Sequence, residues 1–119
     1  RHYLYLQQDS HWNSVGAYIG LTEIYDVLDI DYQELDTLEI ETVEKKGGDL
    51  SDLCGYCLTY DDFIVHYKDD IITKINSYDD DNTLIYDSGQ VLANNAVVIG
   101  DSFRLAISPL LAKDFNKSN

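Results

Sequence analysis

The short sequence with the most recognisable chemistry is Cys54-Gly55-Tyr56-Cys57, a C-x-x-C motif. In redox proteins this motif opens a helix that follows a strand, because the positive end of the helix lowers the thiol pKa. Here Leu58-Thr59-Tyr60 follows and favours a strand. A zinc site would need two further ligands, and only His66 is near in the sequence. We therefore expect ordinary packed cysteines, with no metal and no other cofactor.

The other polar residues give no recognisable catalytic motif. Asp79-Asp80-Asp81-Asn82, with Asp87, is rich in oxygen ligands. It lacks the spacing and the closing glutamate of an EF-hand loop, so it favours a polar turn. His2, His11 and His66 are scattered, and no Ser or Cys stands in a recognised nucleophile motif. The sequence therefore predicts no catalytic residues, and we expect a protein that is not an enzyme.

Charge is the strongest signal in the chain. There are 8 basic and 22 acidic residues, which gives a formal net charge of −14. Residues 23–44, here called the acidic segment, contain nine acids and no Lys or Arg. General solubility would explain a dispersed negative charge, but this concentration favours a docking surface. The predicted partner-binding residues are Glu23, Asp26, Asp29, Asp31, Glu34, Asp36, Glu39 and Glu41, with Tyr25 and Tyr32 stacking on incoming arginines; Glu44 completes the nine acids.

The elements that must carry these residues are predicted to be mainly β, or α+β with one short helix. Short apolar runs with turn signals every 8–12 residues favour an antiparallel β-sandwich or a strongly bent sheet. The alternative to strands at 17–21 and 24–28 is a helix over 15–28, capped by Asn13 or Ser14, and residues 22–28 remain open. The remaining strands are expected at 2–7, 38–43, 53–60, 63–67, 71–75, 83–86, 91–92, 96–99 and 103–107, with one helical turn after Pro109.

The length suits a single domain over residues 1–119, with a frayed tail at 116–119. No apolar run approaches the roughly 18 residues that span a bilayer, so we expect no membrane contact. The sequence contains no methionine and begins at Arg1, which indicates a processed or trimmed chain. That leaves the compartment unknown, with the cytoplasm favoured.

A negative field of this size repels nucleic-acid phosphate and attracts basic proteins. The sequence therefore predicts a small acidic inhibitor that occludes a basic partner, such as a cognate toxin or a nucleic-acid-binding enzyme. The most concrete forms are an immunity protein that neutralises a bacterial nuclease toxin and a nucleic-acid mimic. Neither form binds nucleic acid directly. The alternative is an extracellular module of β-strands that binds carbohydrate or calcium, in which Trp12, the tyrosines and the Asp-rich turns would serve.

Overall fold

The computed structural model describes residues 2–67, 74–77, 84–87, 94–115 and 117–118. The chain divides into two compact units, Arg1–Lys68 and Asp69–Asn119, and each is described by itself. The α+β class is confirmed, with 39% helix and 22% strand. The described strands form one two-stranded and one three-stranded sheet, both antiparallel, and a sandwich is not shown among them.

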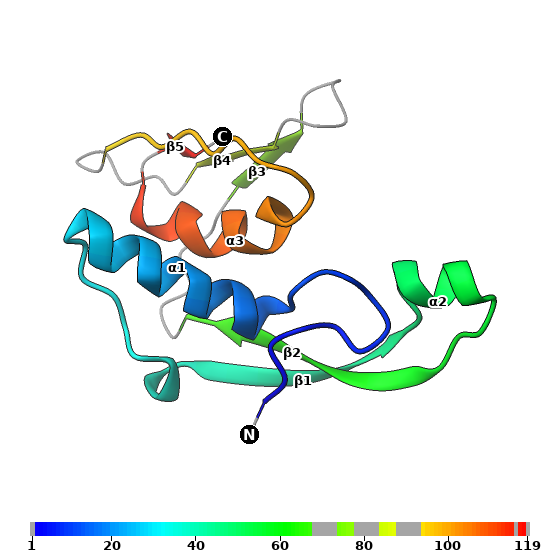
Figure 1. Cartoon of the computed structure of the whole chain (residues 1–119). Coiled ribbons are helices and arrows are strands. Elements are labelled where there is room, and N and C mark those ends of the chain that lie inside the picture. Colours follow the sequence, from blue (N-terminus) through cyan, green and yellow to red (C-terminus); the bar gives the residue numbers. More distant parts are fainter. Residues whose placement is uncertain (1, 68–73, 78–83, 88–93, 116, 119) are drawn as a thin grey trace. The chain divides into compact units, whose positions relative to one another are not determined.

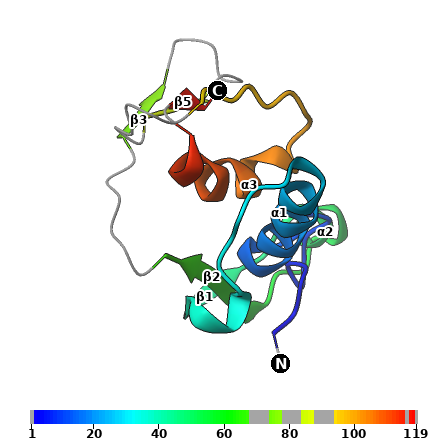
Figure 2. The ribbon, with the colours of Figure 1, turned by 90° about the vertical axis from the view of Figure 1, so that its left-hand side faces the viewer.

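The first unit is a long helix lying against a two-stranded ribbon (Figures 1 and 2). The helix is α1 (Ser14–Leu28), and the ribbon pairs β1 (Glu39–Lys46) with β2 (Thr59–His66). Glu39 lies opposite His66 at one end of the ribbon, and Lys46 lies opposite Thr59 at the other. The short helices η1 (Leu35–Thr37) and α2 (Asp49–Cys54) flank β1 along the chain.

Helix α1 corrects the preferred strand at 17–21, shows that residues 22–28, which the sequence leaves open, are helical, and confirms the helical alternative. Val15, Tyr18, Leu21 and Tyr25 recur every three or four residues, and each is at most 1% exposed, so they form one fully buried face. At the N-terminus, Asn13 Oδ1 accepts a hydrogen bond from Gly16 N at 3.0 Å. This buried face stabilises a helix that the two glycines would otherwise weaken.

Those glycines allow close packing. A Cβ at Gly16 would lie 2.1 Å from the backbone oxygen of Leu4, and one at Gly20 would lie 3.0 Å from the Trp12 ring. The absence of a side chain therefore lets the N-terminal residues pack directly on α1. This contact fixes the segment that immediately precedes the helix.

The second unit contains a small antiparallel sheet and a helix. The sheet order is β3 (Lys74–Ser77), β4 (Leu84–Asp87) and β5 (Lys117–Ser118). The helix α3 (Arg104–Leu111) continues into η2 (Ala112–Asp114). The strand predicted at 103–107 is therefore wrong. Ile107, Leu110 and Leu111 are buried at helical spacing, and this pattern outweighs the apolar alternation that suggested a strand.

The strand predicted at 83–86 is confirmed within β4, except that Thr83 lies outside the described residues. The strands predicted at 2–7 and 96–99 are wrong, because each stretch holds only an isolated bridge residue. Of the strand predicted at 71–75, the described residues 74–75 belong to β3.

The strands predicted at 38–43 and 63–67 are confirmed within β1 and β2, except that Leu38 and Tyr67 lie just outside them. The one at 53–60 is wrong at its start, because Leu53 and Cys54 belong to α2. The strand at 91–92, the turns expected near 78–82 and 88–89, and part of the 63–75 hairpin lie outside the described residues. In the described part, β2 pairs with β1 and β3 pairs with β4.

No helix in the described ranges is both long and apolar enough to cross a membrane.

Candidate functional site

The candidate site of the first unit lies on a loop that folds back just before α1. Leu6 N donates to His11 O at 3.1 Å, and Asn13 N donates to Leu4 O at 3.0 Å. Tyr5 and Trp12 form an antiparallel bridge between the two arms. Residues 7–10 therefore form the tip of a narrow hairpin-like turn, which we call the tip loop.

The tip loop is held by the start of α2 and by the segment before β2. Gln8 makes two hydrogen bonds with the Leu58 backbone, of 2.7 Å to its oxygen and 2.8 Å from its nitrogen. The Gln8 backbone oxygen also accepts from Leu50 N and Ser51 N, at 3.2 and 3.3 Å. A Cβ at Gly48 would lie 2.5 Å from that same oxygen, so the close approach requires glycine. These contacts give the loop a defined conformation.

Within this loop the structure brings Asp9 and His11 together. Asp9 Oδ1 lies 2.6 Å from His11 Nδ1 and accepts from His11 N at 2.9 Å. Asp9 Oδ2 accepts a longer hydrogen bond, of 3.3 Å, from Asp49 N. The Asp9 side chain is 16% exposed and that of His11 is 29% exposed. The sequence analysis treated His11 as isolated, so it missed this Asp9–His11 pair.

The electrostatics of Asp9 favour its ionised form. Burial by itself raises the pKa of this carboxyl, but hydrogen bonds from the His11 backbone and ring and from the Asp49 backbone outweigh it, and the pKa is lowered. An ionised Asp9 accepts a hydrogen bond from the Nδ1–H group of His11, and this bond fixes the tautomer of the ring. The other nitrogen, Nε2, is then the one that can take up a proton. This is the arrangement of a general base with its orienting carboxylate.

The lowered pKa predicts how stability depends on pH. A carboxyl with a depressed pKa in the folded state stabilises the protein fully above its ordinary pKa, here 3.8, and loses this contribution as the pH falls through the folded value. We expect the free energy of unfolding to fall more steeply below pH 3.8 in the wild type than in Asp9→Asn. Urea unfolding at several pH values measures this. Parallel profiles for the two proteins would contradict it.

The same residues raise the question of a metal site. Asp9, His11 and Asp49 each offer a ligand atom, and these atoms lie within 4.8 Å of one another. The carboxylate oxygens of both aspartates, however, already accept hydrogen bonds. Asp49 Oδ1 accepts from Ser10 N at 2.7 Å, and Asp49 Oδ2 accepts from Ser10 Oγ. A cation would have to displace these donors, so the geometry fits a hydrogen-bonded pair better than a metal centre.

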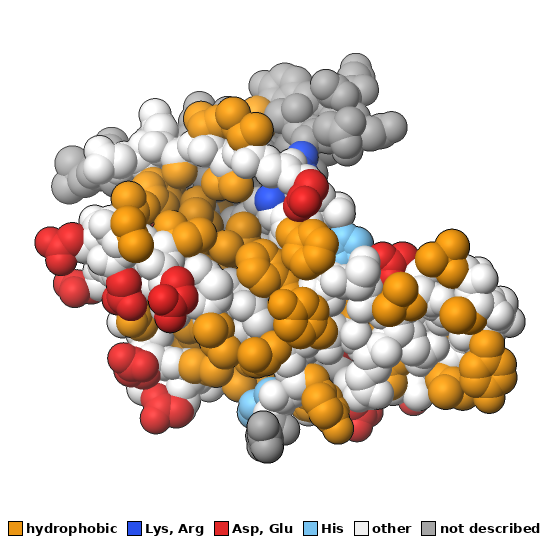
Figure 3. All heavy atoms as spheres, in the orientation of Figure 1, with side chains coloured by type: hydrophobic (Ala, Val, Ile, Leu, Met, Phe, Trp, Pro, Cys, Tyr) orange, Lys and Arg blue, Asp and Glu red, His pale blue; other side chains and the backbone are white. Residues whose placement is uncertain are grey.

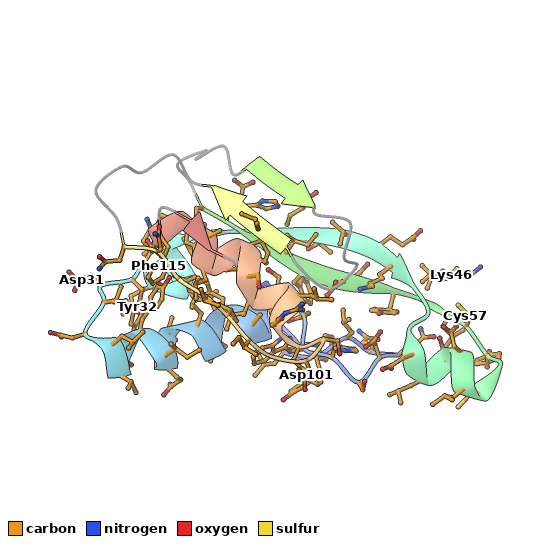
Figure 4. All side chains as sticks on the ribbon, turned by 90° about the horizontal axis from the view of Figure 1, so that it is seen from above. Asp31, Tyr32, Lys46, Cys57, Asp101 and Phe115 are labelled. Atoms are coloured by element: carbon orange, nitrogen blue, oxygen red, sulfur yellow. The ribbon has the colours of Figure 1, made fainter. Side chains whose placement is uncertain are left out.

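A second group suited to chemistry lies in the other unit. Ser102 is exposed and stands in Gly100-Asp101-Ser102-Phe103, directly before α3. Asp101 shapes this turn, because its Oδ1 accepts from Phe103 N at 3.0 Å and its backbone oxygen accepts from Arg104 N at 3.1 Å. Figure 4 labels Asp101 at this position.

In the G-x-S-x-G nucleophile elbow, the serine stands on a sharp turn between a strand and a helix. Gly100-Asp101-Ser102-Phe103-Arg104 shares the first glycine, the serine and the following helix, but has arginine at the second glycine position and no named strand directly before it among the described residues. The sequence signal was the triplet Gly100-Asp101-Ser102. It was missed because residues 103–107 were predicted to be a strand, and a nucleophile turn needs a helix after the serine.

The acidic segment runs along the second half of α1, the connection to η1, and β1. All nine of its acids are exposed. Figure 3 shows acidic side chains gathered over the C-terminal end of α1 and around η1. Asp31 and Tyr32 lie at that end of the unit in Figure 4. The predicted partner-binding acids are therefore on the surface, although the structure does not bring all of them into one cluster.

The two tyrosines of the acidic segment differ. Tyr25 is 1% exposed, with its ring centre 6.5 Å from that of Tyr32. It therefore cannot stack on an arginine of a partner, which corrects the predicted role, because α1 turns Tyr25 into the core. Tyr32 is partly exposed, and its pKa is raised, first by a hydrogen bond to Asp26, then by burial, and then by the charges of Asp26, Glu34 and Glu23.

The C-x-x-C motif lies at the end of the unit opposite to Asp31 (Figure 4). Cys54 is the last residue of α2, and Cys54 and Cys57 are both exposed and free. The prediction of packed cysteines is therefore wrong. The motif ends a helix instead of opening one, so the helix dipole does not activate these thiols in the way that a redox motif requires.

No known protein-family model matches the chain, and no curated protein sequence matches it. Two solved structures share its fold. A DHHW family protein from Eubacterium siraeum has a TM-score of 0.66 and 17% identity, over 98% of this chain and 50% of its own. PatB1 from Bacillus cereus has a TM-score of 0.65 and 17% identity, over 97% of this chain and 52% of its own. The chain thus spans about half the length of each, and at this identity the likeness shows the fold alone.

Proposed function

We propose that this chain belongs to an enzyme that cleaves or transfers acyl esters through a serine nucleophile. Within the first unit, His11 is the general base and Asp9 orients it. The observation that carries the proposal is the 2.6 Å contact between Asp9 Oδ1 and His11 Nδ1. A proposal of an enzyme replaces the expectation of a protein without catalytic residues.

In the proposed reaction, a serine hydroxyl attacks the carbonyl carbon of the ester while its proton passes to His11 Nε2. Asp9 stabilises the imidazolium that forms. The tetrahedral intermediate then expels the alcohol, which takes the proton from His11 and leaves an acyl group on the serine. Attack by water on this acyl group gives hydrolysis, whereas attack by another alcohol gives acyl transfer, and either step returns the free enzyme.

The neighbours give limited support. Read as one-letter residue codes, the family name DHHW agrees at three of four positions with Asp9-Ser10-His11-Trp12 of this chain. Those residues include the Asp9–His11 pair, and Trp12 packs on Gly20 of α1. A named set of residues that coincides with the pair favours a role in function. It does not identify the ester.

The experiment is a turnover assay with p-nitrophenyl acetate, an activated ester that reports serine-type acyl chemistry through release of nitrophenol. The wild type should show saturable turnover above the rate of free imidazole. A rate that rises only linearly with ester concentration, and that is unchanged in His11→Ala, would contradict the proposal. The magnitudes for the variants are argued in the Discussion.

A second candidate function rests on the acidic segment. All nine of its acids are exposed, and the segment itself contains no Lys or Arg. This concentration of exposed negative charge favours docking of a basic protein, with charge steering the association.

Reversing Asp29, Asp31, Glu34 and Asp36 to lysine should lower the association rate of a basic partner at least about tenfold at low salt. The matched control reverses Asp52, Asp61, Asp69 and Asp70, four acids outside the acidic segment, which leaves the net charge equal. Stopped-flow association with a basic nuclease measures the rate. Equal slowing by both variants would show that net charge matters and this surface does not.

A further inference from the structure

We propose that Asp49 is a positioning residue for the Asp9–His11 pair, acting through Ser10. This inference rests on the proposed function, in which the orientation of His11 sets the rate. Asp49 contacts Ser10, which lies between Asp9 and His11, and it contacts no atom that reacts in the proposed mechanism.

The contacts of Asp49 carry this inference. Its Oδ1 accepts from Ser10 N at 2.7 Å, and its Oδ2 accepts from Ser10 Oγ. Its backbone N–H donates to Asp9 Oδ2 at 3.3 Å. One residue at the start of α2 therefore holds two consecutive members of the Asp9-Ser10-His11 sequence, both of them across a separation of about 40 positions in the chain.

The position of the Asp49 side chain indicates that it orients His11 through the loop and does not bond to the ring directly. Its Oδ2 lies 3.7 Å from His11 Nδ1, beyond hydrogen-bond distance, whereas Asp9 Oδ1 lies at 2.6 Å. Asp49 therefore does not compete with Asp9 for the Nδ1 proton. Its contribution to catalysis is to restrict the backbone of Ser10, so that the short contact between Asp9 and His11 is maintained before substrate binds.

Three variants and one control test this. Asp49→Ala removes both contacts to Ser10, whereas Asp49→Asn keeps hydrogen-bonding groups there and removes the charge. Ser10→Ala removes only the hydroxyl contact and is the milder change if Asp49→Ala fails to fold. Asp52→Ala is the control, because Asp52 is an exposed acid on the same helix.

The first readout is the NMR signal of the His11 Nδ1 proton, recorded without substrate, so that it reports the pair even if the ester assay fails. We expect the signal to broaden or disappear in Asp49→Ala and to persist in Asp49→Asn and Asp52→Ala. The second readout is kcat for p-nitrophenyl acetate, which should fall about tenfold to a hundredfold in Asp49→Ala with KM nearly unchanged, and less than about threefold in Asp49→Asn.

The inference is overturned if Asp49→Ala keeps the signal and matches Asp52→Ala in kcat. It is also overturned if Asp49→Asn loses as much as Asp49→Ala, because charge and not position would then be responsible. Absence of turnover in the wild type would refute the proposed function alone, and the NMR comparison would still decide the role of Asp49.

Discussion

Replacing His11 with alanine is expected to lower kcat for p-nitrophenyl acetate at least about a thousandfold. The serine hydroxyl is a weak nucleophile at neutral pH, and without the imidazole no group takes its proton in the transition state. Asp9→Asn should lower kcat about a hundredfold or more, because an amide no longer holds the Nδ1 proton and the ring can present the wrong nitrogen. Steady-state kinetics measure both effects.

The chain offers a matched control for this prediction. His66 Nε2 lies 2.7 Å from Glu41 Oε2 on the exposed face of the β1–β2 ribbon, so it too forms a close histidine–carboxylate pair. His66→Ala should leave kcat within about twofold of the wild type, because this pair lies on an open strand surface. If His66→Ala and His11→Ala lose the same activity, the Asp9–His11 pair has no special role.

Replacing Ser102 with alanine is the second change with a large expected effect. It removes the hydroxyl that the second unit offers as a candidate nucleophile on the turn before α3, so kcat should again fall at least about a thousandfold. Steady-state kinetics of the variant measure this.

Folding must be checked for Ser102→Ala, because the turn before α3 depends on local hydrogen bonds. The contacts from Asp101 to Phe103 N and Arg104 N do not involve the Ser102 side chain, so the turn should persist. Circular dichroism of the variant should match that of the wild type. The control is Ser77→Ala on β3 of the same unit, and activity lost equally in both variants would contradict a specific role for Ser102.

The accuracy of the secondary-structure predictions depended on whether residue propensity or the spacing of apolar residues was given more weight in each stretch. In α1, the glycines at 16 and 20 counted against a helix, yet the spacing of Val15, Tyr18, Leu21 and Tyr25 defined its buried face. The reason for those glycines is packing against Leu4 and Trp12, which lie four or more residues away in sequence but touch α1 in space. Such tertiary contacts override local propensity.

The candidate site was missed for two physical reasons. Asp9 and His11 are two positions apart, which in an isolated peptide places no short contact between them, and the 2.6 Å distance exists because Gln8 and Ser10 tie the tip loop to α2 and Leu58. Ser102 was missed because its meaning depends on the helix that follows it. Asp9 and His11, and likewise Gly100 and Ser102, are close in the sequence. Their geometry, however, is set by the helices and loops around them, which the sequence pattern did not predict.

The acidic segment was predicted correctly as a surface feature, since its charges cannot be buried without partners. Its assignment as a docking surface stays a prediction. The structure removes Tyr25 from that surface and leaves the nine acids exposed.

The most direct test of the central claim is the intact mass of the protein after treatment with a fluorophosphonate, a reagent that labels activated serines. Peptide mapping should find one serine adduct in the wild type, and this adduct should form at least about a hundredfold more slowly in His11→Ala. An unlabelled wild type, or serine labelling whose rate does not change in His11→Ala, would contradict the claim.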